Sequence, residues 1–496
     1  MKTTNMIEIQ RNPDKKVIYI KRVLLINPFV YGSKSINIGV DPVVSRHAGQ
    51  EIKTGVTFPI GLAYMAATLL KAGYEVRVMD PIAERISVRQ IYDASDWADA
   101  IVMPYSSVQR EDIKRYFYDF RDKLRILGGG IAKYVHSYLF QNDIADIILN
   151  GEPEETIVDI MRQFPGIHNV AGIIYRTHSG DSVITQERQP VSNLDSLPFP
   201  IRNFTNPAYY WDISFFGRAT AWILPTRGCP FKCIFCAQHD VNQRSVRKRS
   251  PENIVDEIEK IIKEQGVRNF AFFDETFNLD LEFNISVCDE ILKRNIKIKW
   301  WCAARPDLVT ENAVKKMKES GCIEMRFGIE SANDSILDYL GKNTTVEKMR
   351  KGIQVTRKAG MNYSFQCIFG SPMESEETIK NTMEFISEMK PLYVSFNVLT
   401  PLPGSMLFEQ IKDKLDLVDG MKRFDILHTD FPLGKYSSEE LMGIIKKAYI
   451  GYYFSFSFVS RLIEEFFKNP TMGFWMIKTL LKQSRYVYAS ILKKAE

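Results

Sequence analysis

The sequence predicts an α/β protein made of a doubly wound parallel sheet, a partial (β/α)6 barrel and a helical C-terminal region, in that order. Short apolar runs alternate with helical patterns from residue 22 to residue 163, and again from residue 219 to residue 397. Such alternation is typical of parallel sheets covered by helices. After residue 404 the patterns are helical, and a chain of 496 residues exceeds the usual size of one domain.

The N-terminal part, residues 1–190, is interpreted as an open doubly wound sheet, flavodoxin-like or Rossmann-like. Residues 22–27 form an apolar run that ends before Pro28, as a buried parallel strand would. Residues 59–73 predict a helix with proline in its first turn and glycine past its end. The loop 29–58 is long, and long loops inside compact domains are usually functional. Further strands are expected at 75–80, 100–103, 125–127 and 147–149, with helices at 112–121 and 153–163.

Polar and glycine residues gather at the carboxyl ends of these predicted strands, where doubly wound sheets bind their ligands. The glycines would let the backbone approach a flat or phosphorylated ligand closely. A tight strand-to-helix turn explains a glycine triplet equally well. The candidate ligand-binding residues are Asn27, Asp80, Ser106, Ser107, Gly128, Gly129, Gly130, Gly151 and Glu152.

Residues 170–195 alternate and are punctuated by turn residues, which predicts a hairpin. The proline-rich stretch 197–200 suits a joint between domains. We therefore place a linker at 191–215, a barrel at 216–404 and a helical domain at 405–496.

Six strands are predicted for the barrel, which makes it incomplete compared with a TIM barrel of eight. A helix opens at Ser250, with serine at its N-cap and Pro251 at its first position. The basic residues before it, Arg244 and 247–249, fit either a solvated surface or an anion clamp. The strands are expected at 219–226, 269–274, 299–304, 324–329, 363–369 and 393–397.

Three cysteines follow the first barrel strand at a C-x3-C-x2-C spacing: Cys229, Cys233 and Cys236. Three thiolates from one short loop can each hold one iron of a [4Fe-4S] cluster, and no fourth cysteine lies nearby in sequence to close the fourth iron. That open iron could chelate a small molecule through an amine and a carboxylate. The alternatives are a redox C-x2-C pair or a zinc site. Zinc needs four ligands, and the nearest candidate for the fourth is His239.

This loop closely resembles the cysteine motif of the radical S-adenosylmethionine (SAM) enzymes, down to Phe235, which in that family lies beside the adenine. The resemblance implies a [4Fe-4S] cluster and SAM as cofactors. It also implies that residues at later strand ends bind SAM. An ordinary structural role stays open for each of them, such as a helix cap or an ion pair within the barrel. The implied SAM-binding residues are Asp274 and Glu275 for the ammonium, Arg305 for the carboxylate, Glu330 and Ser331 for the ribose, and Gly370 for the adenine.

The first domain resembles the cobalamin-binding domain that precedes many radical SAM cores, which implies cobalamin as a third cofactor. The likeness is carried by 59–66, Asp80, Ser106 with Ser107, the glycine triplet and 151–154. Cobalamin domains that supply a histidine to cobalt carry Asp-x-His-x-x-Gly, whereas this chain has Asp-Pro-Ile-Ala-Glu at 80–84. The resemblance therefore implies a cobalamin with a weak or absent lower axial ligand.

Together the two resemblances imply a cobalamin-dependent radical SAM methyltransferase of class B, acting on an unactivated carbon of an apolar, lipid or secondary-metabolite intermediate. A cyclase, a rearrangement enzyme or a carbon-carbon coupling enzyme would use the same cofactors without methylation. A methylthiotransferase typically has an extra cysteine triad in its N-terminal domain, but residues 1–200 contain no cysteine. A non-enzymatic cobalamin sensor would have no need of three cluster cysteines. Tyr363 and Asn397 are among the candidates for the substrate site.

Composition limits the partners. A net charge of +5 spread over the chain is no signature of nucleic-acid binding. The polar N-terminus and the lack of a long apolar run predict a cytoplasmic protein. The resemblance to radical SAM enzymes implies an external electron donor of flavodoxin or ferredoxin type. From Tyr449 to Lys494 aromatic residues alternate with cations. This segment fits helices packed on the barrel, which we favour, or a peripheral contact with an anionic membrane.

Overall fold

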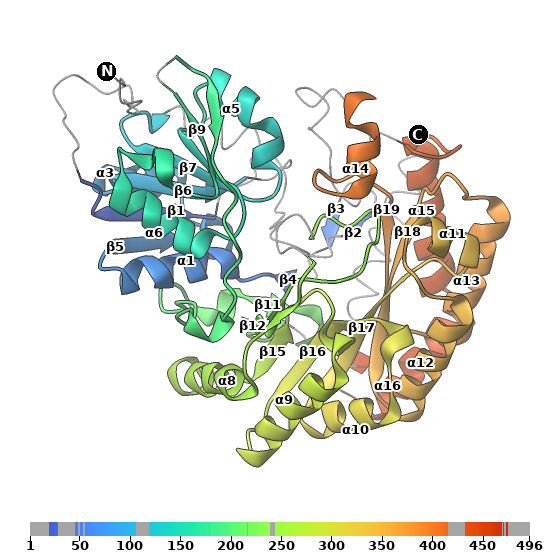
Figure 1. Ribbon diagram of the computed structural model, residues 1–496. Coiled ribbons are helices and arrows are strands. Elements are labelled where there is room, and N and C mark those ends of the chain that lie inside the picture. Colours follow the sequence, from blue (N-terminus) through green and yellow to red (C-terminus); the bar gives the residue numbers. More distant parts are fainter. Residues whose placement is uncertain are drawn as a thin grey trace.

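The computed structural model describes residues 19–27, 45–47, 50–52, 55–105, 119–177, 179–215, 217–238, 244–414, 432–468, 470 and 473–474. Two sheets with their helices lie side by side, the N-terminal one in blue to green and the second in green to orange (Figure 1). Several predictions lie outside the described residues: Ser106, Ser107, His239, most of the loop 29–58 and most of the helix at 112–121.

The N-terminal sheet has five parallel strands in the order β5-β1-β6-β7-β8, so that the second strand of the domain lies outside the first. This is the flavodoxin-like order, and it confirms the predicted doubly wound sheet. Helices α1 and α6 cover one face and α3 and α5 the other. The elements are β1 (Arg22–Ile26), α1 (Ile60–Lys71), β5 (Glu75–Met79), α2 (Pro81–Glu84), α3 (Val88–Trp97), β6 (Ala100–Pro104), β7 (Leu124–Gly128), α5 (His136–Gln141), β8 (Ile147–Leu149) and α6 (Pro153–Gln163).

The predicted hairpin is formed by β9 (Ile173–Arg176) and β10 (Ser182–Ile184). It extends the same sheet, because β9 pairs antiparallel with β8. The sheet therefore has seven strands, with the two antiparallel ones at one edge.

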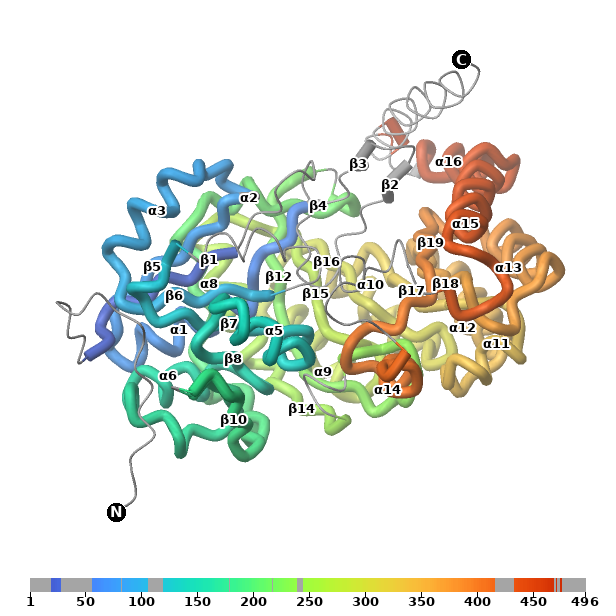
Figure 2. The backbone as a smooth tube through the Cα atoms, turned by 90° about the horizontal axis from the view of Figure 1, so that it is seen from above, coloured from blue at the N-terminus to red at the C-terminus, as the bar shows by residue number. Residues whose placement is uncertain are grey.

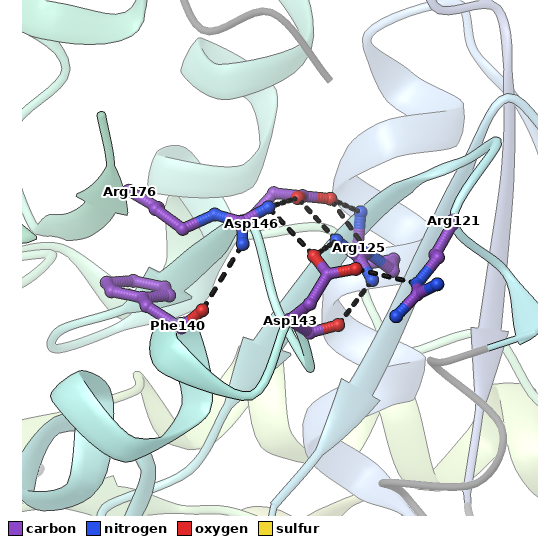
Figure 3. A network of polar contacts seen from close by, with 6 residues as sticks. All are labelled: Arg121, Arg125, Phe140, Asp143, Asp146 and Arg176. Atoms are coloured by element: carbon purple, nitrogen blue, oxygen red, sulfur yellow. Dashed lines mark hydrogen bonds and ion pairs between the residues drawn. The ribbon is translucent and has the colours of Figure 1, made fainter. Parts of the chain in front are cut away.

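A buried ion network fixes the amino ends of β7 and β8 (Figure 3). Arg125 is only 1% exposed, and its Nη2 lies 2.8 Å from Oδ1 of Asp146 and 2.8 Å from Oδ1 of Asp143. Arg176 binds the same Asp143 oxygen at 2.8 Å. Burial alone would raise the pKa of Asp143, but the two guanidinium groups bring it below its ordinary value. The network lies at the edge opposite the strands' carboxyl ends, so we assign it to stability.

The second sheet has six parallel strands, each paired with the next in chain order, which confirms the predicted partial barrel. The predicted strand at 219–226 is broken near Pro225, which has no N–H for a ladder, and its end forms a separate two-residue strand. The six strands are β12 (Ala221–Ile223), β15 (Asn269–Phe272), β16 (Lys299–Ala304), β17 (Cys322–Glu330), β18 (Asn362–Phe369) and β19 (Val394–Val398). The helices between them are α8 (Pro251–Gln265), α9 (Leu281–Lys293), α10 (Glu311–Glu319), α11 (Asp334–Tyr339), α12 (Val346–Lys358) and α13 (Glu376–Met389).

The segment before the barrel enters its interior. Inward-facing Trp222 and Trp301 pack in one cluster with Tyr210 and Phe215. Asp212, in β11 (Trp211–Asp212), binds Nη2 of Arg326 at 2.6 Å, and that guanidinium stacks on Trp301 at 3.5 Å. Ser214 donates to Oε2 of Glu324 at 2.5 Å, and Ser364 donates to Oε1 at 2.6 Å. The predicted linker therefore closes the amino end of the barrel.

The C-terminal region is helical, as predicted, with α14 (Met406–Ile411), α15 (Ser438–Tyr453) and α16 (Phe456–Lys468). Helix α15 packs on the barrel, because Tyr449 accepts from the backbone N–H of Phe396 at 3.1 Å and Tyr452 donates to the carbonyl of Pro391 at 2.5 Å. The packed interpretation thus holds for α15. No helix within the described ranges has the length and apolar character needed to cross a bilayer.

Candidate active site

The cysteine loop is tied at its base by a short antiparallel ribbon. Strand β13 (Thr226–Arg227) pairs with β14 (Arg247–Lys248), and the N–H of Arg249 donates to the carbonyl of Pro225 at 3.0 Å. The loop thus begins and ends just beyond the carboxyl end of β12, at the mouth of the barrel. Cys229, Cys233 and Cys236 lie on it and are half-buried.

Segments far away in sequence hold the middle of this loop. The N–H of Ile234 donates to the carbonyl of Leu340 at 3.0 Å, and its carbonyl accepts from the N–H of Leu407 at 2.9 Å. Gly341 passes so close that a Cβ there would lie 2.8 Å from the carbonyl oxygen of Lys232. Phe235 packs against the apolar cluster that contains Leu340 and Leu407. Sequence reasoning missed 340–341 and 407, because nothing in a local pattern marks a contact of such long range.

The three thiols are a donor set that suits an iron-sulfur cluster. Within the described residues, no three His, Cys, Asp or Glu side chains converge closely enough to share one ion, as zinc would require. In a [4Fe-4S] cluster each thiolate binds a different iron, so the thiols need not converge. Burial raises the pKa of Cys233, and that of Cys236 to about 11, and neighbouring thiols add to both effects. Coordinated irons would offset this cost by binding the thiolates.

Asp274 follows β15 and is the buried acid of the mouth. Its Oδ2 accepts from the hydroxyl of Thr226 at 2.9 Å, while its Oδ1 has no partner in any other described residue. Burial raises its pKa to about 8, and the charge of Glu275 contributes to the rise. An orphaned buried carboxylate oxygen is costly unless a donor meets it. The site is therefore suited to an ammonium group, as predicted for SAM, and that role remains a prediction.

Arg305 has partners for its Nε and Nη2 atoms. Its Nη2 lies 2.9 Å from Oδ2 of Asp307 and 2.7 Å from the carbonyl oxygen of Lys342, and its guanidinium stacks on Phe231 at 3.8 Å. Since Phe231 belongs to the cysteine loop, Arg305 supports that loop. Its predicted contact with the SAM carboxylate is untested.

Glu330 ends β17 with a left-handed φ of +62° and faces Lys342, whose Nζ lies 2.7 Å from its Oε1. Both side chains are buried, and Lys342 was missed by the sequence analysis. Ser331 accepts from Asn333 at 3.1 Å. Gly370 has φ of +102°, and a Cβ there would lie 3.2 Å from Leu441. Glu330, Ser331 and Gly370 thus stand at the mouth, and their predicted contacts with ribose and adenine remain predictions.

On the N-terminal domain, Asp80 is buried and caps α2, accepting from the N–H of Ala83 at 3.2 Å and from the hydroxyl of Tyr210 at 3.1 Å. Burial raises its pKa to about 6. Its neighbour Asn27 is buried and continues the backbone pairing of β1 with Met79. These contacts give Asn27 and Asp80 structural roles, and their predicted contact with cobalamin is untested.

Two glycines at the same edge, Gly129 and Gly151, are exposed. Gly129 has φ of +101°, and a Cβ there would lie 3.0 Å from the carbonyl oxygen of Tyr105. Gly151 has φ of +116° and opens onto free space. Gly128 is buried, and its carbonyl accepts from the N–H of Tyr105 at 2.8 Å. With half-buried Gly130, they form an edge without side chains, which a large flat ligand could approach.

Glu152, whose contact with cobalamin remains a prediction, joins the two domains. Arg247 of the ribbon binds its two oxygens at 2.6 and 2.9 Å, and the N–H of Val191 donates to it at 2.9 Å. Glu154 accepts from Arg227, the ribbon's other arginine, at 2.6 Å. Two arginines of the basic run are therefore neither solvated nor open to a small anion, since Arg247 binds Glu152 and Arg249 binds Glu257. Lys248 is exposed and pairs with Asp280, and Arg244 lies 3.7 Å from the sulfur of Met406.

A second contact between the domains lies on α14. Phe408 packs into the N-terminal core and meets the ring of Tyr134 edge to face, with centroids 5.3 Å apart. Contacts at the ribbon and at α14 thus hold the carboxyl edge of the first sheet against the mouth of the barrel.

Several side chains that face the barrel interior, above the amino end that the predicted linker closes, are half-exposed. Along β18 the outward side chains are buried among the helices, while inward Gln366 and Ile368 are half-exposed. Inward Ala303 and Asn397 are half-exposed as well. Tyr363 faces outward and donates to the carbonyl of Met389, so its predicted place in the substrate site is wrong, whereas Asn397 faces the interior.

Residues 223–386 match the model of the Radical SAM superfamily, which confirms the predicted radical SAM core. An uncharacterized methyltransferase of Pyrococcus horikoshii, PH0819, is 25% identical over 80% of this chain and 87% of its own. An anaerobic magnesium-protoporphyrin IX monomethyl ester cyclase of Cereibacter sphaeroides is 27% identical over 76% of this chain and 64% of its own. The hopanoid C-3 methylase of Methylococcus capsulatus is 25% identical over 75% and 72%.

Two solved structures have the same fold. The radical SAM methyltransferase TsrM from Kitasatospora setae, with cobalamin and a [4Fe-4S] cluster bound, aligns with a TM-score of 0.63 at 17% identity, over 80% of this chain and 78% of its own. The cobalamin-dependent SAM radical enzyme OxsB, with aqua-cobalamin and SAM bound, aligns with a TM-score of 0.60 at 20% identity, over 83% and 59%. The chain therefore has the two-domain fold of cobalamin-dependent radical SAM enzymes.

Proposed function

We propose that this chain, which has a radical SAM core and the fold of the cobalamin-dependent radical SAM enzymes, is a methyltransferase that methylates an unactivated carbon of an apolar or secondary-metabolite intermediate. The observation that carries the proposal is the cysteine loop, held at the mouth of a six-stranded barrel and tied by Arg227 and Arg247 to the carboxyl edge of a doubly wound domain.

Different residues at the mouth of the barrel would bind the cluster and the parts of SAM. Cys229, Cys233 and Cys236 would hold the cluster, and buried Asp274 would take the ammonium of SAM. Glu330, paired with Lys342, stands where a ribose would lie. When bound, the cluster would supply an electron to cleave SAM into a 5′-deoxyadenosyl radical that takes a hydrogen atom from the substrate, and methylcobalamin would supply the methyl group.

The glycine edge of the first domain would receive cobalamin opposite the mouth. Gly129 and Gly151 leave room for the flat face of a corrin, since neither carries a side chain and both are exposed. The ion pairs from Glu152 and Glu154 to the ribbon would keep that face in register with the cysteine loop. The protein's contribution is then positioning and exclusion of water, rather than acid-base chemistry.

Further partners belong to the same proposal. The half-exposed wall residues Ala303, Gln366, Ile368 and Asn397 carry no charge, which favours a neutral substrate. An external flavodoxin or ferredoxin would deliver electrons to the cluster. A peripheral contact of the C-terminal region with a membrane would suit a lipid-like substrate.

A second candidate is a cyclase with the same cofactors, because anaerobic cyclases are among the relatives, at 27% identity over 76% of this chain. The mass of the product separates the two, since methylation adds one methyl group and cyclisation adds none.

The test is anaerobic purification with hydroxocobalamin, followed by quantification of iron, sulfide and corrinoid in one sample. We expect about four irons and one corrinoid per chain. Assays with SAM labelled in its methyl group should then give a labelled product. Iron without corrinoid would remove the cobalamin assignment, and a chain without iron would remove the whole proposal.

Alanine variants locate the cluster. Cys229→Ala, Cys233→Ala and Cys236→Ala should each lose most of the iron. Cys288→Ala is the matched control, because Cys288 is buried in the barrel core away from the mouth. The Cys288→Ala variant should keep its iron.

A further inference from the structure

Helix α16 has one face bound to the barrel. Phe458 is buried in the barrel core, and Arg461 donates to Oδ1 of Asn362 at 2.7 Å while pairing with Glu465 at 3.0 Å. Ser460 accepts from Lys390 at 3.1 Å. These contacts fix the rotation of the helix, so that its opposite face points away from the protein.

That outward face is apolar and exposed. Phe456 is 84% exposed and Phe467 is 81% exposed, with Val459, Ile463 and Phe466 between them at 44%, 52% and 38%. At about 100° per residue, these five positions fall within an arc of roughly 100° on the helix. We call this set the outer α16 face. Figure 2 places α16 at the outer edge of the molecule, beside α15.

The outer α16 face is more than a chance group of scattered exposed apolar residues. Thirteen large apolar side chains are markedly exposed in the described part of the chain, and seven of them lie between Phe454 and Phe474. Isolated exposed apolar residues are normal on a protein surface, but a continuous stripe marks an interaction site.

The sequence that follows indicates what covers the stripe. Residues 475–496 contain five cations, Lys478, Lys482, Arg485, Lys493 and Lys494, against one acid, Glu496. They also contain Trp475, Tyr486 and Tyr488, and aromatic side chains of this kind favour the boundary between lipid and water. A second copy of the chain on the outer α16 face would bring two such cationic segments together. An anionic lipid surface would instead attract them.

We propose that the outer α16 face and the basic segment 475–496 dock this protein on an anionic phospholipid membrane, with α16 lying in the plane of the interface. The aromatic and aliphatic side chains of the stripe enter the boundary between headgroups and acyl chains, and the cations bind the headgroups. Only the purpose of the docking rests on the proposed function. That purpose is to bring the barrel to an apolar substrate that resides in the membrane.

Co-sedimentation of the full chain with vesicles tests the docking. We expect the protein to bind vesicles of phosphatidylcholine mixed with phosphatidylserine about tenfold more tightly than vesicles of phosphatidylcholine alone. Added salt should weaken this binding. The double variant Phe456→Ser with Phe467→Ser should lower the affinity for the anionic vesicles about tenfold, because it removes the two most exposed rings of the stripe.

Ile184→Ser is the matched control, since Ile184 is 61% exposed on β10 and should leave vesicle binding unchanged. Both variants alter exposed residues, so their thermal midpoints should match the wild type. Absent binding, equal binding to both vesicle types, or full binding by the double variant would each overturn the proposal. A wild-type dimer that the double variant converts to a monomer in light scattering would assign the face to a second copy instead. None of these readouts uses iron, corrinoid or SAM, so a failure of the proposed function would be seen separately.

Discussion

Gly341 shows how strongly the cysteine loop depends on a residue that no local pattern marks. We predict that Gly341→Ala lowers the iron retained after reconstitution several-fold, because the new Cβ would lie 2.8 Å from the carbonyl oxygen of Lys232 and push the loop outward. The φ of +65° adds backbone strain of about 1 kcal/mol. Iron per chain and the thermal midpoint measure the two effects.

Gly266→Ala separates these causes. Gly266 has nearly the same φ, +68°, but nothing lies within 4 Å of its would-be Cβ. The Gly266→Ala variant should therefore acquire about the same backbone strain, and lose about the same stability, while keeping its iron. Equal iron loss in both variants would mean that strain, and not contact with Lys232, disturbs the loop.

Asp274 should make the apo protein sensitive to pH. Its folded pKa is raised to about 8, whereas the unfolded chain loses that proton near pH 4. The folded state therefore holds the extra proton, and stability should fall as pH rises from about 4 to about 8. Asp274→Asn should raise the thermal midpoint of the apo protein at pH 8 and weaken SAM binding at least tenfold, because the ammonium loses its carboxylate.

Unfolding scans at pH 6 and pH 8 and equilibrium dialysis with SAM measure these changes. Asp256→Asn is the control, since Asp256 is a half-exposed acid on α8 that pairs with Arg294 on the outside of the barrel. An apo Asp274→Asn protein with unchanged stability and unchanged affinity would remove Asp274 from the SAM site.

At the scale of elements, the β13–β14 ribbon couples the cysteine loop to the N-terminal domain. We predict that Glu154→Gln destabilises the protein by about 3 kcal/mol, because Arg227 is buried and loses its closest charge partner. Glu155→Gln is the control, as Glu155 is exposed one position further along and should change stability by less than about 0.5 kcal/mol. Denaturant unfolding compares the two, and equal effects would mean that the ion pair with Arg227 contributes nothing specific.

The helices and strands of this chain could be predicted where the sequence patterns that indicate them are local. Helix α6 and strand β16 have the predicted bounds, because periodicity, caps and strand length all agree there. The three cysteines of the candidate site were singled out by their spacing and by the resemblance to radical SAM enzymes, and their binding of a cluster stays a prediction. Lys342 and the role of Arg247 could not be predicted, because each depends on a partner in another element, Glu330 at 12 residues and Glu152 at 95 residues along the chain. A local pattern cannot specify which distant charge a buried side chain meets.

At the scale of the whole molecule, the chain between the two sheets is part of the barrel core. A fragment that begins at Thr220 should be insoluble or unstable, because it leaves Trp222 and Trp301 uncovered and Arg326 without Asp212. A fragment that begins at Leu197 retains these contacts and should fold better. Soluble yield and cooperative unfolding compare the two fragments. Equal behaviour would show that the segment between Leu197 and Thr220 is dispensable for the fold.

The bonds that fix Ile234 also set an order of events during synthesis. Leu407, which donates to its carbonyl, leaves the ribosome 171 residues after Cys236, at about 5–20 residues per second, or roughly 10–30 s later. Until then the three cysteines lie on a segment without its final support, and their thiols are open to oxygen and to stray metals. Cluster insertion into this chain is therefore expected only after Leu407 has been made, when the loop has its final support.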